Sequence, residues 1–333
     1  MKKWKLAALI GMIMTGTILA GFGSYASEDE SEAEIYDIVV VIQGQDGEFW
    51  QTVSLGAQAA GEELEGKATV DVQGASSSSD FEGQLSLIEN ILTTSPDALV
   101  IGPASTSGIV SVVDEAMESG IKVTIIDSAI DSDNYDSYIA TDNYAAGQSA
   151  AEAMIEKLEA DGTELVGTVG VISPISGVQS VADRDNGFMD RIAELAPDIE
   201  ILPVVYCDGD MANALSGTQD MYLANQDTLL GIFASADGTA GGVVSAIEES
   251  GIQGEFVVTA IDASDAEIEA LENGIIYALV VQDPYNMGYL GAINSYKMLT
   301  GESVDKDVAS ATALITQENM DEEENQKLLF PLD

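Results

Sequence analysis

Short runs of continuously apolar residues recur along the chain, separated by stretches with a different period. Strands exposed on one face alternate apolar and polar positions, whereas unbroken apolar runs are typical of strands covered on both faces of a parallel sheet. We therefore interpret the runs as buried strands. They lie at residues 37–42, 68–72, 97–102, 122–127, 165–173, 199–206, 229–235, 255–262 and 275–282.

The stretches between these runs have the period of an amphipathic helix. Residues 81–92 place their apolar side chains on one helical face, and Asp80 stands where an N-cap residue is expected. Residues 109–117 follow the same pattern and precede Gly120, a residue type that favours the end of a helix. The alternation of strands and helices predicts an α/β fold with doubly wound parallel sheets, covered by helices on both sides.

The number of strand–helix units exceeds what one open sheet of ordinary size contains. We therefore expect two α/β lobes, although the spacing of the units also fits a closed barrel of eight parallel strands. In either architecture the functional side chains lie on loops at the carboxyl ends of the strands.

The first 26 residues have the pattern of a signal peptide. Three lysines within the first five residues precede an apolar run over residues 6–20, and Ser24-Tyr25-Ala26 has the small-x-small form of a cleavage site. The run is short for a membrane span. Residues 19–22 read LAGF, one letter from a lipobox, but Phe22 has no thiol to carry a lipid, so a lipid anchor is not supported. Residues 27–35 form an acidic leader that we expect to be disordered.

The charge of the chain is strongly negative. There are 58 acidic residues against 11 basic ones, which gives a net charge of −47. Such a surface repels phosphate backbones and anionic lipids, so we exclude nucleic-acid binding and membrane-surface binding, while the charge keeps an exported protein soluble. Cys207 is the only cysteine, so no internal disulfide can form, and we expect it to be a small buried residue.

The residue types present exclude several classes of enzyme and cofactor site. The chain contains no histidine, which rules out Ser-His-Asp and Cys-His catalytic devices and the HExxH zinc site. Residues 131–137 have alternate acids that could hold Ca²⁺, but they lack the glycine and distal glutamate of a calcium loop, so a solvated turn is preferred. Residues 236–242 lack a P-loop lysine and are interpreted as a tight turn. We expect no metal and no cofactor.

The predicted strand ends carry an unusual set of side chains. Phe49 and Trp50 follow the first strand, where they either cap the core or face a flat apolar ligand. Asp127 and Asp262 each follow a buried strand, and Arg184 lies near the start of a helix, where a cation opposes the helix dipole and therefore needs carboxylates or ligand oxygens. Aromatic rings, carboxylates, an arginine and a glutamine are the groups that bind a sugar.

Motifs in order along residues 36–315 resemble the sugar-binding branch of the type I periplasmic binding proteins, and ribose-binding proteins in particular. The motifs are EFW after the first strand, PDALVIGPAST, IKVTIIDS, YIATDNYAAGQSAAE, ADRDNGFMD, VVTAIDAS and ALVVQDPYNMG. The resemblance implies that Phe49 and Trp50 stack on the ligand and that four polar residues bind it. These are Asp127, Arg184, Asp262 and Gln282.

Several positions depart from the ribose-type pattern. Ser128 replaces an arginine, Gly47 and Ala236 replace asparagines, and Gly209 replaces the aromatic residue of the second lobe. Each buried hydroxyl left without a partner costs about 1–3 kcal/mol, so these losses argue against ribose itself. Gln43, Gln45, Tyr206 or Tyr285 could compensate for these losses. The predicted ligand site includes Gln43 and also Asp237, the residue after Ala236.

The resemblance also implies two lobes joined by three strands, which close on a ligand by a hinge motion. We expect an N-terminal lobe of residues 36–141 plus 283–311 and a C-terminal lobe of residues 142–282 plus 312–333. The predicted function is an exported, monomeric binding protein, not an enzyme, that delivers a small carbohydrate-like ligand to the membrane permease of an ABC importer. Two alternatives stay open. One is a secreted glycoside hydrolase that uses Asp127 and Asp262 as its carboxylate pair, and the other is a subunit that presents its ligand to a membrane sensor.

Overall fold

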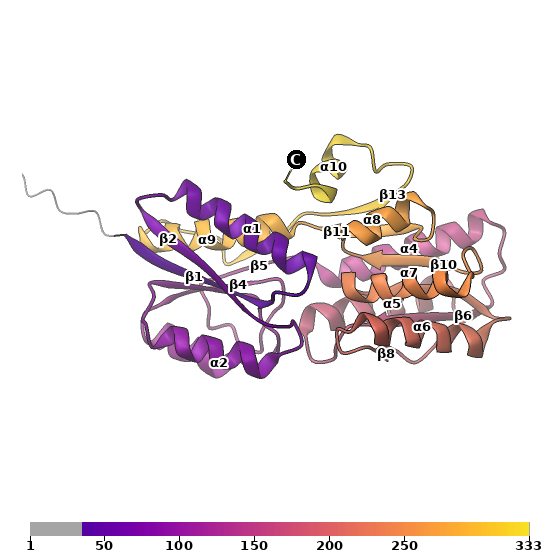
Figure 1. Ribbon diagram of the computed structural model, residues 1–333, viewed down its shortest axis with the longest axis horizontal. Coiled ribbons are helices and arrows are strands. Elements are labelled where there is room, and N and C mark those ends of the chain that lie inside the picture. The colour runs from indigo at the N-terminus through magenta and orange to yellow at the C-terminus, as the bar shows by residue number, and fades with distance from the viewer. Residues whose placement is uncertain (1–34, 333) are drawn as a thin grey trace, which may run out of the picture. The chain divides into compact units, whose positions relative to one another are not determined.

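Two separate sheets organise residues 35–332, the part of the chain that the computed structural model describes (Figure 1). The predicted signal peptide and nearly all of the acidic leader lie outside the described residues. Within residues 35–332, no helix combines the length and the apolar character needed to cross a membrane. Each sheet with its helices is called a lobe below, and the first lobe contains the N-terminal strand.

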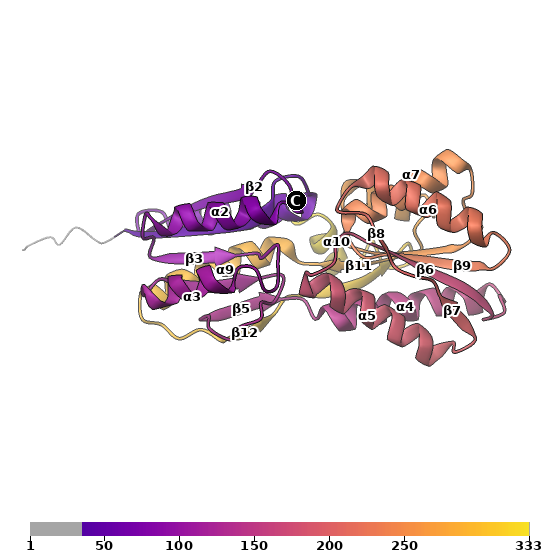
Figure 2. The same ribbon diagram turned by 90° about the horizontal axis from the view of Figure 1, so that it is seen from below.

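The sheet of the first lobe has six parallel strands in the order β12-β5-β4-β3-β1-β2. Helices α1 and α9 cover one face of this sheet, and α2 and α3 cover the other (Figure 2). The bounds are β1 Tyr36–Gly44, β2 Ala68–Ala75, β3 Ala98–Ile101, β4 Lys122–Ile126, β5 Ser137–Ala140, β12 Asp307–Ala309, α1 Glu48–Glu63, α2 Phe81–Leu92, α3 Val110–Glu118 and α9 Pro284–Leu299.

The sheet of the second lobe has the order β13-β11-β10-β9-β6-β7, with β8 also paired to β6. Only β13 is antiparallel to its neighbour. Helices α4 and α5 pack on one face, and α6, α7, α8 and α10 pack on the other. The bounds are β6 Gly167–Ser173, β7 Ile199–Ile201, β8 Val205–Tyr206, β9 Leu229–Ala234, β10 Val257–Ile261, β11 Ala278–Gln282, β13 Thr312–Thr316, α4 Asn143–Ala160, α5 Gln179–Leu195, α6 Met211–Asn225, α7 Asp237–Ser250, α8 Asp265–Glu272 and α10 Glu323–Leu329.

The chain passes between the lobes three times. It leaves the first lobe after β5, returns after β11 and leaves again between β12 and β13. In two of these passages an aspartate caps the helix that follows. Asp142 accepts a hydrogen bond from the backbone N–H of Ala145 in α4, and Asp283 accepts one from the backbone N–H of Asn286 in α9. Side-chain caps of this kind fix where the helix begins on the far side of each passage.

The predicted α/β fold class is confirmed, and the two open sheets exclude the closed barrel that the unit spacing alone allowed. The strand predicted over residues 199–206 is instead the two short strands β7 and β8, because Pro203 lies between them and has no N–H for the ladder. The short strands β5, β12 and β13 were absent from the predicted strand list. Cys207 is buried, as expected.

One pair of helices in each lobe packs unusually closely through glycines. A Cβ atom at Gly147 of α4 would lie 2.1 Å from the carbonyl oxygen of Arg184 in α5, and one at Gly187 would lie 2.1 Å from the carbonyl oxygen of Tyr144. Gly288 of α9 meets the backbone of α1 in the same way in the first lobe. The absence of side chains at these positions lets the helix backbones touch, and in the second lobe this contact sets the position of Arg184.

Two aspartates at strand ends adopt backbone conformations that L-residues rarely have. Asp127 follows β4 with φ of 65°, and Asp262 follows β10 with φ of 90°. Such conformations cost on the order of 1 kcal/mol or more and are concentrated at functional sites. Both carboxylates are buried at the edges of the two sheets that face each other.

Candidate functional site

A cavity of about 260 Å³ lies where the carboxyl ends of the two sheets meet. Ligand cavities commonly measure about 300–1,000 Å³. This cavity lies just below that range, a volume that suits a small ligand. All eight residues predicted to bind a ligand line this cavity. They are Gln43, Phe49 and Trp50 from β1 and α1, Asp127 after β4, Arg184 in α5, Asp237 in α7, Asp262 after β10 and Gln282 in β11.

The aromatic pair divides between the core and the cavity. The two rings meet edge to face, with centroids 5.1 Å apart. The ring of Trp50 is 6% exposed, belongs to the first lobe's core and lies so close to Gly102 that a Cβ there would be 2.5 Å from it. Phe49 is only partly buried and therefore presents more of its ring to the cavity. Of the two readings that the sequence left open, core packing applies mainly to Trp50.

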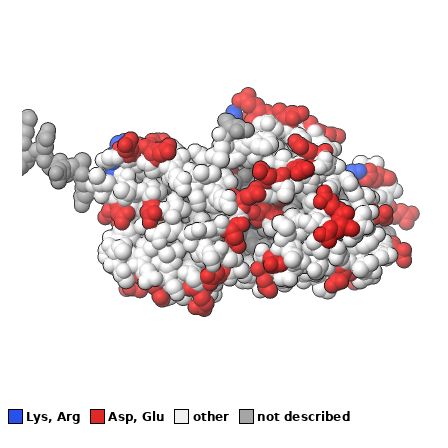
Figure 3. All heavy atoms as spheres, in the orientation of Figure 1, with Lys and Arg blue, Asp and Glu red and all other residues white. Residues whose placement is uncertain are grey.

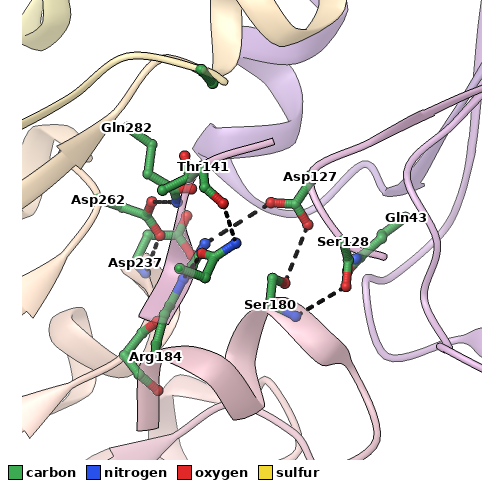
Figure 4. A network of polar contacts seen from close by, with 12 residues as sticks. Gln43, Asp127, Ser128, Thr141, Ser180, Arg184, Asp237, Asp262 and Gln282 are labelled. Carbon is green, nitrogen blue, oxygen red and sulfur yellow. Dashed lines mark hydrogen bonds and ion pairs between the residues drawn. The ribbon is translucent and has the colours of Figure 1, made fainter. Parts of the chain in front are cut away.

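Arg184 connects the two walls of the cavity (Figure 4). Its guanidinium donates from Nε to Oδ1 of Asn143, at 2.7 Å, and from Nη1 to the carbonyl oxygen of Ser235, at 3.0 Å, both in the second lobe. Its Nη2 lies 3.9 Å from Oδ1 of Asp127 in the first lobe. A planar fork with several donors is what this arrangement requires, and lysine cannot supply it.

The second lobe contributes a group of carboxylates that are linked by hydrogen bonds. Asp262 accepts from Nε2 of Gln282, at 2.6 Å, and from the backbone N–H of Asp237, at 3.1 Å. Behind them, Glu267 is fully buried and accepts from both the backbone N–H and the hydroxyl of Ser264, in a capping box at the start of α8.

Burial changes the acidity of these groups. Desolvation raises the pKa of Asp127 to about 6, although the Arg184 guanidinium opposes the rise. Desolvation together with repulsion from Asp262 raises the pKa of Asp237 to about 6. The pKa of Glu267 lies well above its ordinary value because of burial and the charges of Asp262 and Asp237. Without a ligand, the cavity therefore holds poorly compensated negative charge.

A match to known proteins settles the family of this chain. The Periplasmic binding protein domain family matches residues 38–303, which is most of the chain. The chain belongs to this family. The match spans strands and helices of both lobes, including every predicted ligand-binding residue.

Individual relatives resemble the chain over nearly its whole length. It is 26% identical to the ribose import binding protein of Haemophilus influenzae, over 94% of this chain and 99% of the relative. A carbohydrate transporter solute-binding protein from Agrobacterium radiobacter, solved with D-arabinose, has a TM-score of 0.85 and 32% identity, over 89% of this chain and 99% of that one. An ABC transporter solute-binding protein from Agrobacterium vitis, solved with D-fucose, has a TM-score of 0.84 and 34% identity, over 88% and 100%.

Several hydrogen bonds join the lobes beside the cavity. The backbone N–H of Ser180 donates to the hydroxyl of Ser128, at 3.1 Å, and the Ser180 hydroxyl lies 3.5 Å from Oδ2 of Asp127 (Figure 4). On another side, the carboxylate of Glu48 accepts from the backbone N–H of Asp265, at 2.9 Å. The structure is therefore that of closed lobes, in which first-lobe acceptors meet backbone and side-chain donors of the second.

Two groups of lining residues are absent from the eight predicted ones. Ser77 to Ser79 follow β2, which continues three residues beyond its predicted end and so carries this serine-rich loop to the cavity. Apolar side chains of the second lobe, in the loop after β6 and at the starts of α5 and α6, also line the cavity. These are Ile175, Val178, Val181 and Met211. Single aliphatic residues at such positions carry no sequence signal that distinguishes them from core residues.

A second cavity, of about 270 Å³, adjoins the first and shares Phe49, Asp237 and Asp262 with it. Residues 328–332, which are the last two residues of α10 and the three that follow them, also line this second cavity. Figure 1 shows α10 at the C-terminal end of the chain. No sequence pattern indicated that the end of the chain borders the site. Within residues 35–332, no group of three acidic or cysteine residues is placed to hold a metal ion, and this includes the acidic turn over residues 131–137.

The raised pKa of Asp237 predicts a pH-dependent loss of stability. An acid with a folded-state pKa of about 6 and an ordinary value of 3.8 binds its proton more tightly when folded. Its contribution is therefore favourable at low pH and is lost as the pH rises from about 4 to 6. We expect Asp237→Asn to raise the free energy of unfolding by about 1–3 kcal/mol at about pH 7.5, and by less as the pH approaches 5.

Urea unfolding of the ligand-free protein at several pH values measures this difference. Asp198→Asn removes the same charge at an exposed position away from the cavity and should have little effect at any pH. Equal stability of Asp237→Asn and the unmodified protein at about pH 7.5 would contradict the expectation that the ionised carboxylate of Asp237 destabilises the folded state.

Proposed function

We propose that this protein captures a small carbohydrate between its two lobes and delivers it to the membrane permease of an ABC importer. The observation that carries the proposal is that eight side chains from both lobes, chosen from the sequence for sugar binding, line one cavity. The solved relatives bound to D-arabinose and D-fucose support a ligand of this class.

The two walls of the cavity suit the two kinds of surface that a sugar has. The C–H face of a sugar ring packs against aromatic and aliphatic side chains, here Phe49 on one side and Val178 and Met211 on the other. Its hydroxyls exchange hydrogen bonds with carboxylates and amides at the rim of the ring, here Asp127 and Gln282 among others. Each lobe supplies part of both surfaces, so a ligand favours the closed form.

We infer that capture proceeds by a hinge motion of the lobes defined above, residues 36–141 plus 283–311 and residues 142–282 plus 312–333. The three passages of the chain between the sheets form the hinge. Closure brings Ser128 to the backbone of Ser180, while a bound sugar adds contacts to both lobes and shifts the equilibrium towards closure. The permease then meets a surface that exists only in the closed form.

A thermal-shift screen of the purified protein with monosaccharides and polyols tests the function. We expect at least one of these compounds to raise the transition temperature by several degrees at about 100 times its Kd, because a ligand of the folded state adds about 2.7 kcal/mol there. The sugar should be recovered unchanged, as expected of a binding protein and not of a hydrolase.

Arg184→Lys provides the site control for the screen. It removes the fork that joins Asn143, Ser235 and Asp127, so the ligand-induced shift should fall strongly even where circular dichroism shows a folded protein. The absence of any shift across the whole panel, or turnover of a glycoside, would refute the proposed function.

The aromatic pair should separate binding from folding. We expect Phe49→Ala to weaken sugar binding by about 1–2 kcal/mol with a modest loss of stability, since its ring is partly exposed to the cavity. Trp50→Ala should instead cost about 3–5 kcal/mol of unfolding free energy, because its ring is in the core. Calorimetric titration and urea unfolding of both variants measure the two effects, and the opposite ranking would reverse the assignment.

We further infer that the protein is exported by cleavage behind Ala26 and remains without a lipid, because Phe22 has no thiol. Periplasmic relatives support export. The intact mass of the chain recovered from an expressing cell should correspond to residues 27–333, and a mass that includes an acyl chain would contradict this inference.

A further inference from the structure

Part of the hydrogen-bonding capacity of the cavity's side-chain donors is used by acceptors of the protein itself. All three nitrogens of the Arg184 guanidinium face Asn143, Ser235 or Asp127. The amide nitrogen of Gln43 donates to the carbonyl oxygen of Pro103, at 2.7 Å, and that of Gln282 donates to Asp262. Arg184 keeps further N–H groups beside Asp127, whereas the side chains of Asp237, Asp262 and Gln282 have one uncommitted N–H between them, on Nε2 of Gln282.

Acceptors, by contrast, remain available. Oε1 of Gln282 is buried and has no hydrogen-bond partner, although the residue lines the cavity and is 1% exposed. A carboxylate has about four acceptor positions, and Asp262 uses two of them on Gln282 and Asp237. Asp237 accepts from the backbone N–H of Gly238 through Oδ1. An unpartnered buried acceptor is costly, so this wall is complete only with donors from a ligand.

The charged side chains that line the cavity are mostly acidic. The acidic lining residues are Asp46, Glu48, Asp127, Asp237 and Asp262, and Arg184 is the one basic residue that lines the cavity within the described part of the chain. Arg184 faces Asp127 of the first lobe. The carboxylates of the second lobe, with Glu267 behind them, instead have no basic side chain among them, and desolvation together with repulsion from neighbouring carboxylates raises the pKa of both Asp237 and Glu267. Figure 4 shows Asp237, Asp262 and Gln282 gathered on the side of Arg184 opposite Asp127.

We propose that the ligand is an amino sugar or aminopolyol whose protonated amine is held by Asp237 and Asp262, beside Oε1 of Gln282. This inference rests on the carbohydrate-binding function proposed above and narrows its ligand class. An ammonium group brings three donors and a positive charge to a wall that has one uncommitted N–H and no cation among its side chains, whereas a neutral hydroxyl brings one donor and leaves the repulsion between the carboxylates in place. The remaining hydroxyls face Asp127 and the apolar ring face meets Phe49.

Matched sugars that differ in one group test this proposal. D-glucose, D-glucosamine and N-acetyl-D-glucosamine, and the corresponding galactose series, are titrated calorimetrically at low ionic strength in phosphate, because amine buffers would compete. We expect the amino sugar of the better-bound series to bind at least about tenfold more tightly than its parent sugar, and the uncharged N-acetyl derivative to lose this gain.

Site variants locate the amine. Asp237→Asn should reduce the preference for the amino sugar over its parent, measured as the ratio of the two Kd values in the same variant, by about fivefold or more. Asp198→Asn, with the same change of net charge at an exposed position, should leave the preference unchanged. Added salt should reduce the preference less than it would for an exposed ion pair, since Asp262 is buried and Asp237 is partly buried.

The outcomes distinguish the two proposals. If parent sugars bind as well as amino sugars, or if Asp237→Asn leaves the preference intact, the amine assignment is wrong and the carbohydrate-binding function stands. If calcium chloride alone raises the transition temperature and Asp237→Asn abolishes that rise, the acidic wall binds a metal ion and the assignment is equally wrong. If neither series nor the wider sugar panel binds, both proposals fail.

Discussion

A single buried guanidinium holds the centre of this structure. Arg184 is fixed by Asn143 and Ser235 within the second lobe and faces Asp127 of the first. A buried cation is tolerable only when its donors are matched, so the position of this side chain constrains the helices and strand ends around it. The close glycine contact between α4 and α5, the cap at the start of α4 and the end of β9 all place its partners.

The same guanidinium leaves the opposite wall without a counter-charge. Asp262 accepts hydrogen bonds from the amide of Gln282 and from the backbone N–H of Asp237, while burial and the charges of Asp262 and Asp237 raise the pKa of Glu267. Carboxylates that are desolvated without a cation raise their own pKa and destabilise the empty closed form. A binding protein benefits from this arrangement, because a ligand that relieves the repulsion favours closure more strongly than contact area alone would. Acidic side chains greatly outnumber basic ones on the face that Figure 3 shows, and the net charge of the chain is −47, so the long-range field acts in the same direction on any cationic ligand.

The backbone conformation at two strand ends also helps to place the carboxylates of the cavity. Asp127 and Asp262 occupy equivalent places after β4 and β10, and both have positive φ. That conformation turns each side chain away from the direction that a continued strand would give it, and its cost is carried by the surrounding packing. The two lobes therefore present one strained carboxylate each to a shared cavity, although their partners differ: a guanidinium in one case and an amide with a backbone N–H in the other.

Local pattern determined much of this fold before any packing was known. Continuous apolar runs located most of the buried strands, and Asp80 capped α2 where the helical period began. Because parallel strands bring their carboxyl ends to one edge, the strand list also selected all eight of the predicted ligand-binding residues, which line the cavity. They include Arg184, whose place near a helix start required carboxylates or ligand oxygens.

The tertiary structure decided what depends on contacts between distant segments. It placed Trp50 in the core and left Phe49 facing the cavity, because only the packing of Trp50 against Gly102 shows which of the two rings is buried. It also split the strand at Pro203, placed Ser77 to Ser79 and the C-terminal segment beside the cavity, and left Gln282 with an unpartnered oxygen. A sequence specifies which groups are available, whereas hydrogen-bond partners and uncompensated charge are properties of pairs, and pairs exist only once the chain has folded.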